Sequence, residues 1–111
     1  MARVKPRRGE VWWVAFDPTQ GSEVTKRRPA VIVSNDRSNR YLDRVQVVPL
    51  TSNTDRVYVS ECLVTLKQQS GKAMADQVRT VSTDRLDGRI STLTDDEMRA
   101  VETVLRIQLD L

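Results

Sequence analysis

The sequence has no histidine, only one cysteine and no apolar run near the ~20 residues of a membrane-spanning helix. Without histidine there is no imidazole acid–base chemistry, and Cys62 alone forms no internal disulfide. We interpret Cys62 as a small buried thiol in a strand. The carboxylates form no cluster along the sequence, and a cysteine pair for zinc is missing. We therefore expect no metal and no cofactor.

The length of 111 residues fits one domain, which we expect to span residues 1–111. Hydrophobic residues make up 39% of the chain, enough to form a modest core rather than a disordered segment. Residues 1–8 are basic, but no apolar segment of the signal-peptide type follows them. We expect a soluble cytoplasmic protein.

The charge is distributed unevenly along the chain. Residues 1–56 contain 11 Lys and Arg against 6 Asp and Glu, a net charge of +5, whereas residues 57–111 contain 7 against 9, a net charge of −2. This asymmetry is typical of a protein that binds a polyanion, although a solvated surface with a basic tail explains it equally well.

Strand-forming residues recur along most of the chain between polar, Gly- or Pro-containing turns. We predict strands at 11–16, 29–33, 45–50, 57–66, 73–81 and 89–93, with turns at 34–43 and 67–72 and one helical turn at 82–86. Pro29 fits at the start of its strand, where a missing N–H does least harm. Residues 17–27 form a loop longer than a tight hairpin needs, which favours a functional role.

The last segment predicts an amphipathic helix over 95–109. Thr94 and Glu97 have the spacing of a capping box, and apolar residues then follow at helical intervals. Several short strands with one terminal helix predict a mainly β fold, a small, strongly curved antiparallel barrel. A homodimer would add buried area that so short a chain cannot easily supply alone.

Polar residues at strand ends form the candidate site. Arg28 begins one predicted strand, and Thr51 and Ser52 end another, so that a curled sheet can bring them together. Backbone near Gly21 and the side chains of the 17–27 loop would complete an anion pocket. Taken separately, a solvated arginine and ordinary turn chemistry explain each piece at least as well.

Two further pairs of side chains matter for binding. Trp12 and Trp13 alternate faces, so we expect one in the core and the other partly exposed, where it stacks a base or contacts a second subunit. Gln77 and Arg79 are two apart and share a face of the predicted 73–81 strand, toward a groove or toward water.

The order of several short segments resembles that of the MazF/PemK-type toxins. The segments are RGEVWWV (8–14), DPT (17–19) with GSE (21–23), RPAVIVSN (28–35), VVPLT (47–51) and ADQVRT (75–80). They cover nearly the whole chain. The sequence departs from the pattern of these toxins at residues 24–27, which read VTKR where relatives often have Gln and Gly.

The resemblance implies an SH3-like homodimeric barrel of the CcdB/PemK/MazF type that cleaves single-stranded RNA at specific sequences without a metal and is blocked by a cognate antitoxin. It implies that Arg28 and Thr51 are catalytic and that Ser22, Glu23 and Gln77 lie in or beside the RNA cleft. We add Ser52 and Arg79 as RNA-binding residues.

The expected reaction is attack of a ribose 2′-OH on the adjacent phosphorus, which leaves 2′,3′-cyclic phosphate and 5′-OH ends. Arg28 would neutralise the phosphoryl oxygens and Thr51 would donate a hydrogen bond, while Glu23 is the nearby carboxylate that can accept a proton. The alternatives are a non-catalytic barrel toxin that poisons a topoisomerase through its terminal helix, and a non-catalytic RNA-binding module. The topoisomerase-poisoning mode needs neither Arg28 nor Thr51.

Overall fold

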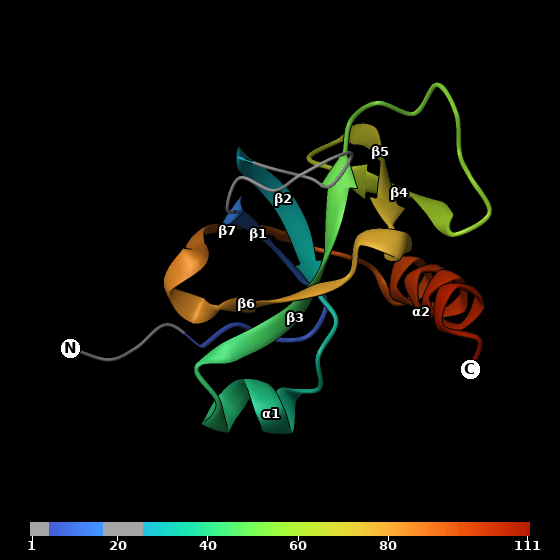
Figure 1. Ribbon diagram of the computed structural model, residues 1–111. Helices are drawn as coiled ribbons and strands as arrows, with labels where there is room; N and C mark the ends of the chain where they lie inside the picture. The colour runs from blue at the N-terminus through green and yellow to red at the C-terminus, as the bar shows by residue number, and fades with distance from the viewer. Residues whose placement is uncertain (1–4, 17–25) are drawn as a thin grey trace.

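The structure, a computed structural model, describes residues 5–16 and 26–111, and its elements are mostly strands (Figure 1). Ser22 and Glu23, and with them the loop predicted to cover the site, lie outside the described residues. The elements in order are β1 (Glu10–Phe16), β2 (Lys26–Ile32), α1 (Asp36–Tyr41), β3 (Arg44–Thr51), β4 (Glu61–Leu66), β5 (Gln69–Met74), the 3-10 turn η1 (Ala75–Gln77), β6 (Arg79–Ser82), the 3-10 turn η2 (Thr83–Arg85), β7 (Leu86–Thr92) and α2 (Asp95–Leu109).

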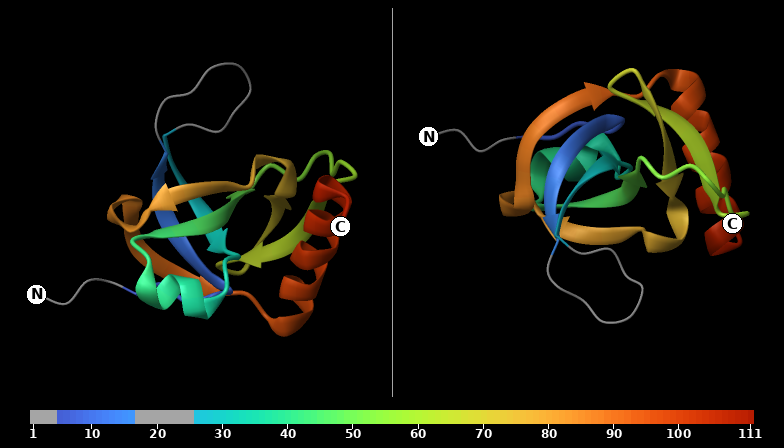
Figure 2. Two further views of the ribbon diagram at one scale, coloured as in Figure 1. Left: turned by 60° about the horizontal axis from the view of Figure 1, so that its bottom comes forward. Right: turned by 90° about the horizontal axis from the view of Figure 1, so that it is seen from above.

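Strand β3 is the centre of the sheet. It pairs with β2 along one edge, and along the other its first half pairs with β6 and its last two residues pair with β5. The main path runs β4-β5-β3-β2-β1-β7, and every pairing is antiparallel. Because β3 is shared by two sets of partners, the sheet bends there and curls into a half-barrel, as the two views of Figure 2 show. The predicted mainly β curved fold is confirmed.

Both faces of the curled sheet carry apolar clusters, because strand residues alternate sides. The concave face holds a cluster built around Phe16, and the other face holds one that packs against α2. The first cluster contains Trp12, Val14, Phe16, Ala30, Ile32, Val45, Val47, Met74 and Val81, and the second contains Val11, Val31, Val48, Leu50, Val64, Ala73, Leu93 and Val101. The strands are therefore buried on both sides, which fixes their register firmly.

Helix α2 has the bounds that the sequence predicts, and its capping box is present. The Thr94 hydroxyl accepts a hydrogen bond from the Glu97 amide at 3.1 Å, and the Glu97 carboxylate accepts one from the Thr94 amide at 2.9 Å. The second oxygen of Glu97 accepts a hydrogen bond from the Thr65 amide of β4 at 2.6 Å. One carboxylate thus caps the helix and attaches it to the sheet.

Several sequence predictions were wrong in detail. The predicted 57–66 strand begins only at Glu61, and the turn predicted at 67–72 is limited to residues 67–68, because β5 begins at Gln69. The predicted 73–81 strand is broken by η1 into the end of β5 and the start of β6. Pro29 lies inside β2, opposite Trp13 of β1, rather than at its start. The 34–43 turn contains helix α1, whose N-cap Asn35 accepts a hydrogen bond from the Ser38 amide.

A buried ion pair ties the segment after β3 to the sheet. The Lys72 ammonium lies 2.8 Å from the Glu61 carboxylate, and their side chains are only 10% and 8% exposed. The ammonium also donates a hydrogen bond to the Arg56 carbonyl at 2.6 Å, and Glu61 accepts one from the Tyr58 amide at 2.8 Å. These contacts hold residues 52–60 against β4 and β5.

In the described part of the chain, no helix is long and apolar enough to cross a membrane. The lone thiol, Cys62, lies in β4 and is half-buried, so the expected buried position is only partly realised. Burial raises the pKa of this thiol above its ordinary value, which keeps it protonated near neutral pH.

The two roles of Glu97 predict a pH-dependent contribution to stability. Burial raises the pKa of its carboxyl, but hydrogen bonds from Thr94 and Thr65 outweigh burial, and the net pKa is below the ordinary value. The charged form therefore stabilises the fold fully above about pH 4.3, the unfolded carboxyl pKa, and less as the pH falls. We expect Glu97→Gln to lower the melting temperature near neutral pH, and this difference from the native chain to narrow as the pH falls below about 4.3. Melting curves over the pH range test this, and a constant gap would contradict it.

The ion pair predicts a non-additive mutant cycle. Lys72→Met leaves the Glu61 carboxylate buried without a cation, which costs about 3 kcal/mol of unfolding free energy. The double variant Lys72→Met/Glu61→Leu removes both charges, so we expect it to be more stable than Lys72→Met alone. Urea denaturation of the four proteins measures the coupling, and additive losses would show that the two side chains act independently.

Candidate functional site

The register of β2 and β3 brings Arg28 and Thr51 to the same end of the two strands. The paired residues are Ile32 with Val47, Val31 with Val48 and Ala30 with Pro49, and the pairing stops there. Both positions lie two residues from Ala30 and Pro49, so they share the concave face of the sheet with Ile32 and Val47. Pro49 has no N–H to extend the ladder, and the side chains of Arg28 and Thr51 are left at the open end of the two strands.

The open end of β2 and β3 forms a cavity of about 310 Å³. Its lining consists of Trp13, Lys26, Arg27, Arg28, Pro29, Leu50, Thr51, Ser52 and Leu66. The structure therefore brings together the three described residues that the sequence analysis placed at strand ends, Arg28, Thr51 and Ser52. Among the described residues of this lining, three cationic side chains stand against no carboxylate, which makes the cavity electropositive.

Arg28 is the most unusual group in this cavity. The residue is partly buried, and within the described residues its Nε is buried without a hydrogen-bond partner. Nearly all buried polar atoms in folded proteins have a partner, and an unmade hydrogen bond to a buried donor is costly. An unsatisfied guanidinium donor at the wall of a cavity is suited to an anionic oxygen supplied by a ligand.

Thr51 presents its hydroxyl as a donor. Its Oγ1 accepts a hydrogen bond from the Asn53 amide at 3.2 Å, which leaves the hydroxyl hydrogen free to point elsewhere. The Asn53 side chain in turn accepts from the Asp55 amide at 3.1 Å, so the segment after β3 is held by successive local hydrogen bonds. Ser52 lies between these two anchored residues and is exposed.

The wall of the cavity on the β1 side is a stacked pair that the sequence analysis did not assign. The Arg27 guanidinium lies 4.2 Å from the centre of the Trp13 ring, and its Nε is 2.9 Å from the Asp87 carboxylate of β7. Trp12 is 8% exposed in the core whereas Trp13 is half-buried, so the expected division between the two rings is confirmed. The adjacent tryptophans were the only sequence signal for this wall.

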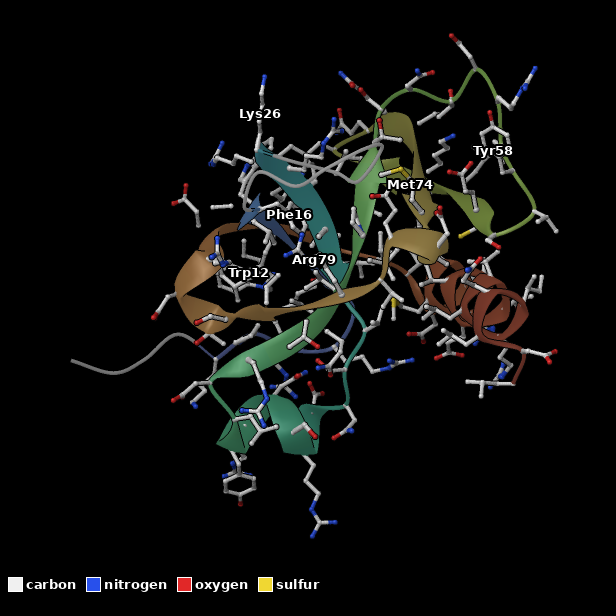
Figure 3. The ribbon with its side chains drawn as sticks, in the orientation of Figure 1. Trp12, Phe16, Lys26, Tyr58, Met74 and Arg79 are labelled. Atoms are coloured by element: carbon white, nitrogen blue, oxygen red, sulfur yellow. The ribbon has the colours of Figure 1, made fainter. Side chains whose placement is uncertain are left out.

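Gln77 and Arg79 do not line the cavity, and the prediction that they share one strand face is wrong because Gln77 belongs to η1. Arg79 begins β6, and its guanidinium lies 5.3 Å from the centre of the Phe16 ring on the concave face (Figure 3). The Gln77 amide contacts the sulfur of Met74, also on that face. Both side chains therefore extend the polar surface beside the cavity rather than form it.

Among the described residues, no group of three or more His, Cys, Asp or Glu side chains is arranged to hold a metal ion. The polar groups that the cavity does offer are guanidinium, ammonium and hydroxyl groups. These groups bind an anion such as a phosphodiester and can stabilise negative charge that develops on it.

Residues 7–109 match the family of PemK-like, MazF-like toxins of type II toxin–antitoxin systems. The chain is 40% identical to "Endoribonuclease MazF9" of Mycobacterium tuberculosis over 95% of this chain and 97% of that protein. A crystal structure of MazF from Deinococcus radiodurans is similar with a TM-score of 0.85 and 26% identity, covering 97% of this chain and 99% of that one.

A mycobacterial endoribonuclease in complex with its cognate antitoxin is similar with a TM-score of 0.80 and 27% identity, covering 96% of each chain. The family match and the relative at 40% identity each span nearly all of the sequence. The chain belongs to the family of PemK-like, MazF-like toxins of type II toxin–antitoxin systems.

Proposed function

We propose that this chain is the toxin of a toxin–antitoxin pair and acts as a sequence-specific endoribonuclease on single-stranded RNA, with the cavity at the ends of β2 and β3 as its active site. The observation that carries the proposal is that Arg28 and Thr51 line one cavity, with the Arg28 Nε buried and without a hydrogen-bond partner among the described residues. The name and 40% identity of the mycobacterial endoribonuclease support it.

The reaction proceeds by attack of a ribose 2′-oxygen on the adjacent phosphorus. The new bond joins the 2′-oxygen to phosphorus, the bond from phosphorus to the 5′-oxygen breaks, and the products are a 2′,3′-cyclic phosphate and a 5′-hydroxyl. The 2′-OH loses a proton and the leaving 5′-oxygen gains one. No metal is needed, and DNA is not cleaved because it lacks the nucleophile.

Arg28 and Thr51 stabilise the negative charge that builds on the phosphoryl oxygens. The Arg28 fork can donate two parallel hydrogen bonds, and the Thr51 hydroxyl can donate one from the opposite strand. Because a guanidinium stays charged near neutrality, Arg28 is suited to protonate the leaving oxygen rather than to remove the 2′ proton. We assign the role of proton acceptor to Glu23, because it is the carboxylate that the family resemblance places in the loop beside the cleft.

The RNA lies across the cavity at the ends of β2 and β3. Ser52 lines the cavity, and the half-buried Trp13 ring offers a stacking surface for a base. Arg79 and Gln77 lie near Phe16 and Met74 on the concave face and contact flanking nucleotides. Ser22 is assigned to RNA binding by the resemblance.

The partners proposed are a cognate antitoxin and a second copy of this chain, all in the cytoplasm. Apolar side chains are exposed on the segment before β4, on β4 itself and at the end of α2: Val57, Tyr58, Val59, Leu63, Ile107, Leu109 and Leu111. Contiguous elements carry them, since α2 packs on β4. Exposed apolar surface of this kind is typical of a protein interface, and we assign it to the homodimer.

Cleavage of a long single-stranded RNA in EDTA tests the activity. We expect discrete cuts with 5′-OH ends by the native chain, and a rate lowered about 100- to 1,000-fold in Arg28→Gln and in Thr51→Val, because each removes a donor to the transition state. Thr51→Ser keeps the hydroxyl and should retain most activity.

Arg44→Gln is the matched control, since Arg44 is exposed at the far end of β3. It should cut like the native chain. Intact RNA under all conditions would leave only the non-catalytic alternatives, and loss of cutting on addition of EDTA would show that a metal takes part.

The homodimer is tested by placing a charge in the apolar surface. Leu63 is 58% exposed on β4, so Leu63→Asp should shift the protein from dimer to monomer in sedimentation without unfolding it. Gln69→Asp, at an exposed position of the neighbouring strand β5, is the control for a charge outside the apolar set. A native chain that sediments as a monomer at micromolar concentration contradicts the assignment.

A further inference from the structure

A second, larger cavity lies beside helix α1, at the opposite end of β2 and β3 from Arg28 and Thr51 (Figure 1). Its volume is about 730 Å³, and its polar lining consists of Lys5, Arg7, Asp36, Arg37, Arg40 and Tyr41. The residues come from two segments about 30 positions apart in the sequence, which the fold brings together. Neither the mechanism nor the family resemblance assigns a role to them.

The backbone around this cavity is fixed by specific contacts. The Arg8 amide donates a hydrogen bond to the Asp36 carboxylate at 2.7 Å, which joins the N-terminal segment to α1. The Arg8 guanidinium donates to the Val33 carbonyl and pairs with Glu102 of α2. Pro6, which also lines the cavity, is less than 2% exposed. The charged side chains therefore project from a wall that is held in place before any ligand binds.

The cavity has a strong positive charge that its own residues do not neutralise. Lys5, Arg7, Arg37 and Arg40 are all exposed, and none of them forms an ion pair within the described residues. The single carboxylate, Asp36, already accepts hydrogen bonds from the Arg8 amide and from the Asn39 side chain. The cavity thus has four cations and one carboxylate that is already hydrogen-bonded, and this net positive charge favours binding of a polyanion.

An exposed aromatic ring beside the cations indicates which type of polyanion the cavity binds. The Tyr41 ring is 73% exposed, and the Arg40 guanidinium lies 5.9 Å from its centre. Cations combined with an exposed aromatic ring are typical of sites for single-stranded nucleic acid, where the cations bind phosphates and the ring stacks a base. An acidic peptide would use the cations and leave the ring without a partner.

We infer that the α1 cavity is a second binding site for single-stranded RNA, in which the four cations bind backbone phosphates and Tyr41 stacks a base. The inference rests on the proposed ribonuclease function for the identity of the polyanion. Strand β3 joins the two sites and spans on the order of 20 Å at ~3.3 Å per residue. The cavity therefore contacts nucleotides remote from the scissile phosphate and raises the affinity for long RNA over short RNA.

The test is a binding measurement that does not depend on cleavage. The probe is a fluorescent 2′-O-methyl RNA of about 20 nucleotides, longer than the ~4–16 nucleotides that a small barrel module covers. Such RNA cannot be cut, because its 2′-oxygen is blocked. Fluorescence anisotropy over a range of salt concentrations gives the affinity and its salt dependence.

We expect Arg37→Gln/Arg40→Gln to weaken binding about tenfold or more at low salt. Loss of two phosphate contacts should also reduce the slope of log K against log salt by about 1.4, at ~0.7 per phosphate on a single strand. The control Arg99→Gln/Arg106→Gln removes the same charge from exposed positions on α2 and should change affinity less than about twofold. A probe of about 6 nucleotides should not distinguish the α1 variant from the native chain.

Tyr41 separates RNA from an acidic peptide. Tyr41→Leu should weaken RNA binding roughly fivefold or more, whereas Tyr41→Phe keeps the ring and should bind like the native chain. A polyglutamate peptide of similar charge should bind more weakly than the RNA and should not respond to Tyr41→Leu. Polyglutamate that binds as tightly as RNA, with no effect of Tyr41→Leu, would assign the cavity to an acidic protein segment and overturn the inference.

The other outcomes are also decisive. Unchanged binding of the long probe by folded Arg37→Gln/Arg40→Gln, with melting curves like those of the native chain, overturns the inference while leaving the ribonuclease function intact. Conversely, a native chain that cuts no RNA but binds the probe through Arg37, Arg40 and Tyr41 overturns the proposed function and supports the RNA site.

Discussion

The antiparallel register between β2 and β3 is the constraint on which the candidate site depends. It is set by the buried pairs Ile32 with Val47 and Val31 with Val48, which are fully excluded from solvent on the two faces of the sheet. A slip of one residue would turn each apolar side chain to the opposite face. Since two different clusters lie on these faces, packing selects one register, and with that register Arg28 and Thr51 line one cavity.

Placing Arg28 there has an energetic cost. A partly buried guanidinium whose Nε has no hydrogen-bond partner among the described residues is destabilising, because a buried donor without a partner loses its hydration. The apolar pairs further along the same two strands offset that cost. The proposed reaction would use such an arrangement, since a donor aimed in advance at developing charge requires no reorganisation during the chemical step.

The sequence was most informative where local and long-range preferences agree. Helix α2 combines a capping box with an apolar stripe, and its predicted bounds are correct. The apolar runs of β2 and β3 made a meeting of Arg28 with Thr51 plausible, but register depends on which side chains pack together, and no local pattern contains that information. Polar residues at 34–43 indicate a turn, yet the same residue types cap helices, and Asn35 caps α1. The stacking of Arg27 on Trp13 joins two strands. It could not be predicted from the sequence because, like the register, it depends on which side chains pack together.

The arginines of the basic half divide into two groups, which explains why net charge alone was ambiguous. Arg8 and Arg27 are engaged by acidic residues of α2 and β7, so their charges connect elements of the fold. Arg28, Arg37 and Arg40 form no ion pair within the described residues, and each lines a cavity. Arg44, by contrast, is exposed and lines neither cavity. The position of Arg28, Arg37 and Arg40 in two cavities joined by one strand supports the proposal that these three charges bind an extended polyanion.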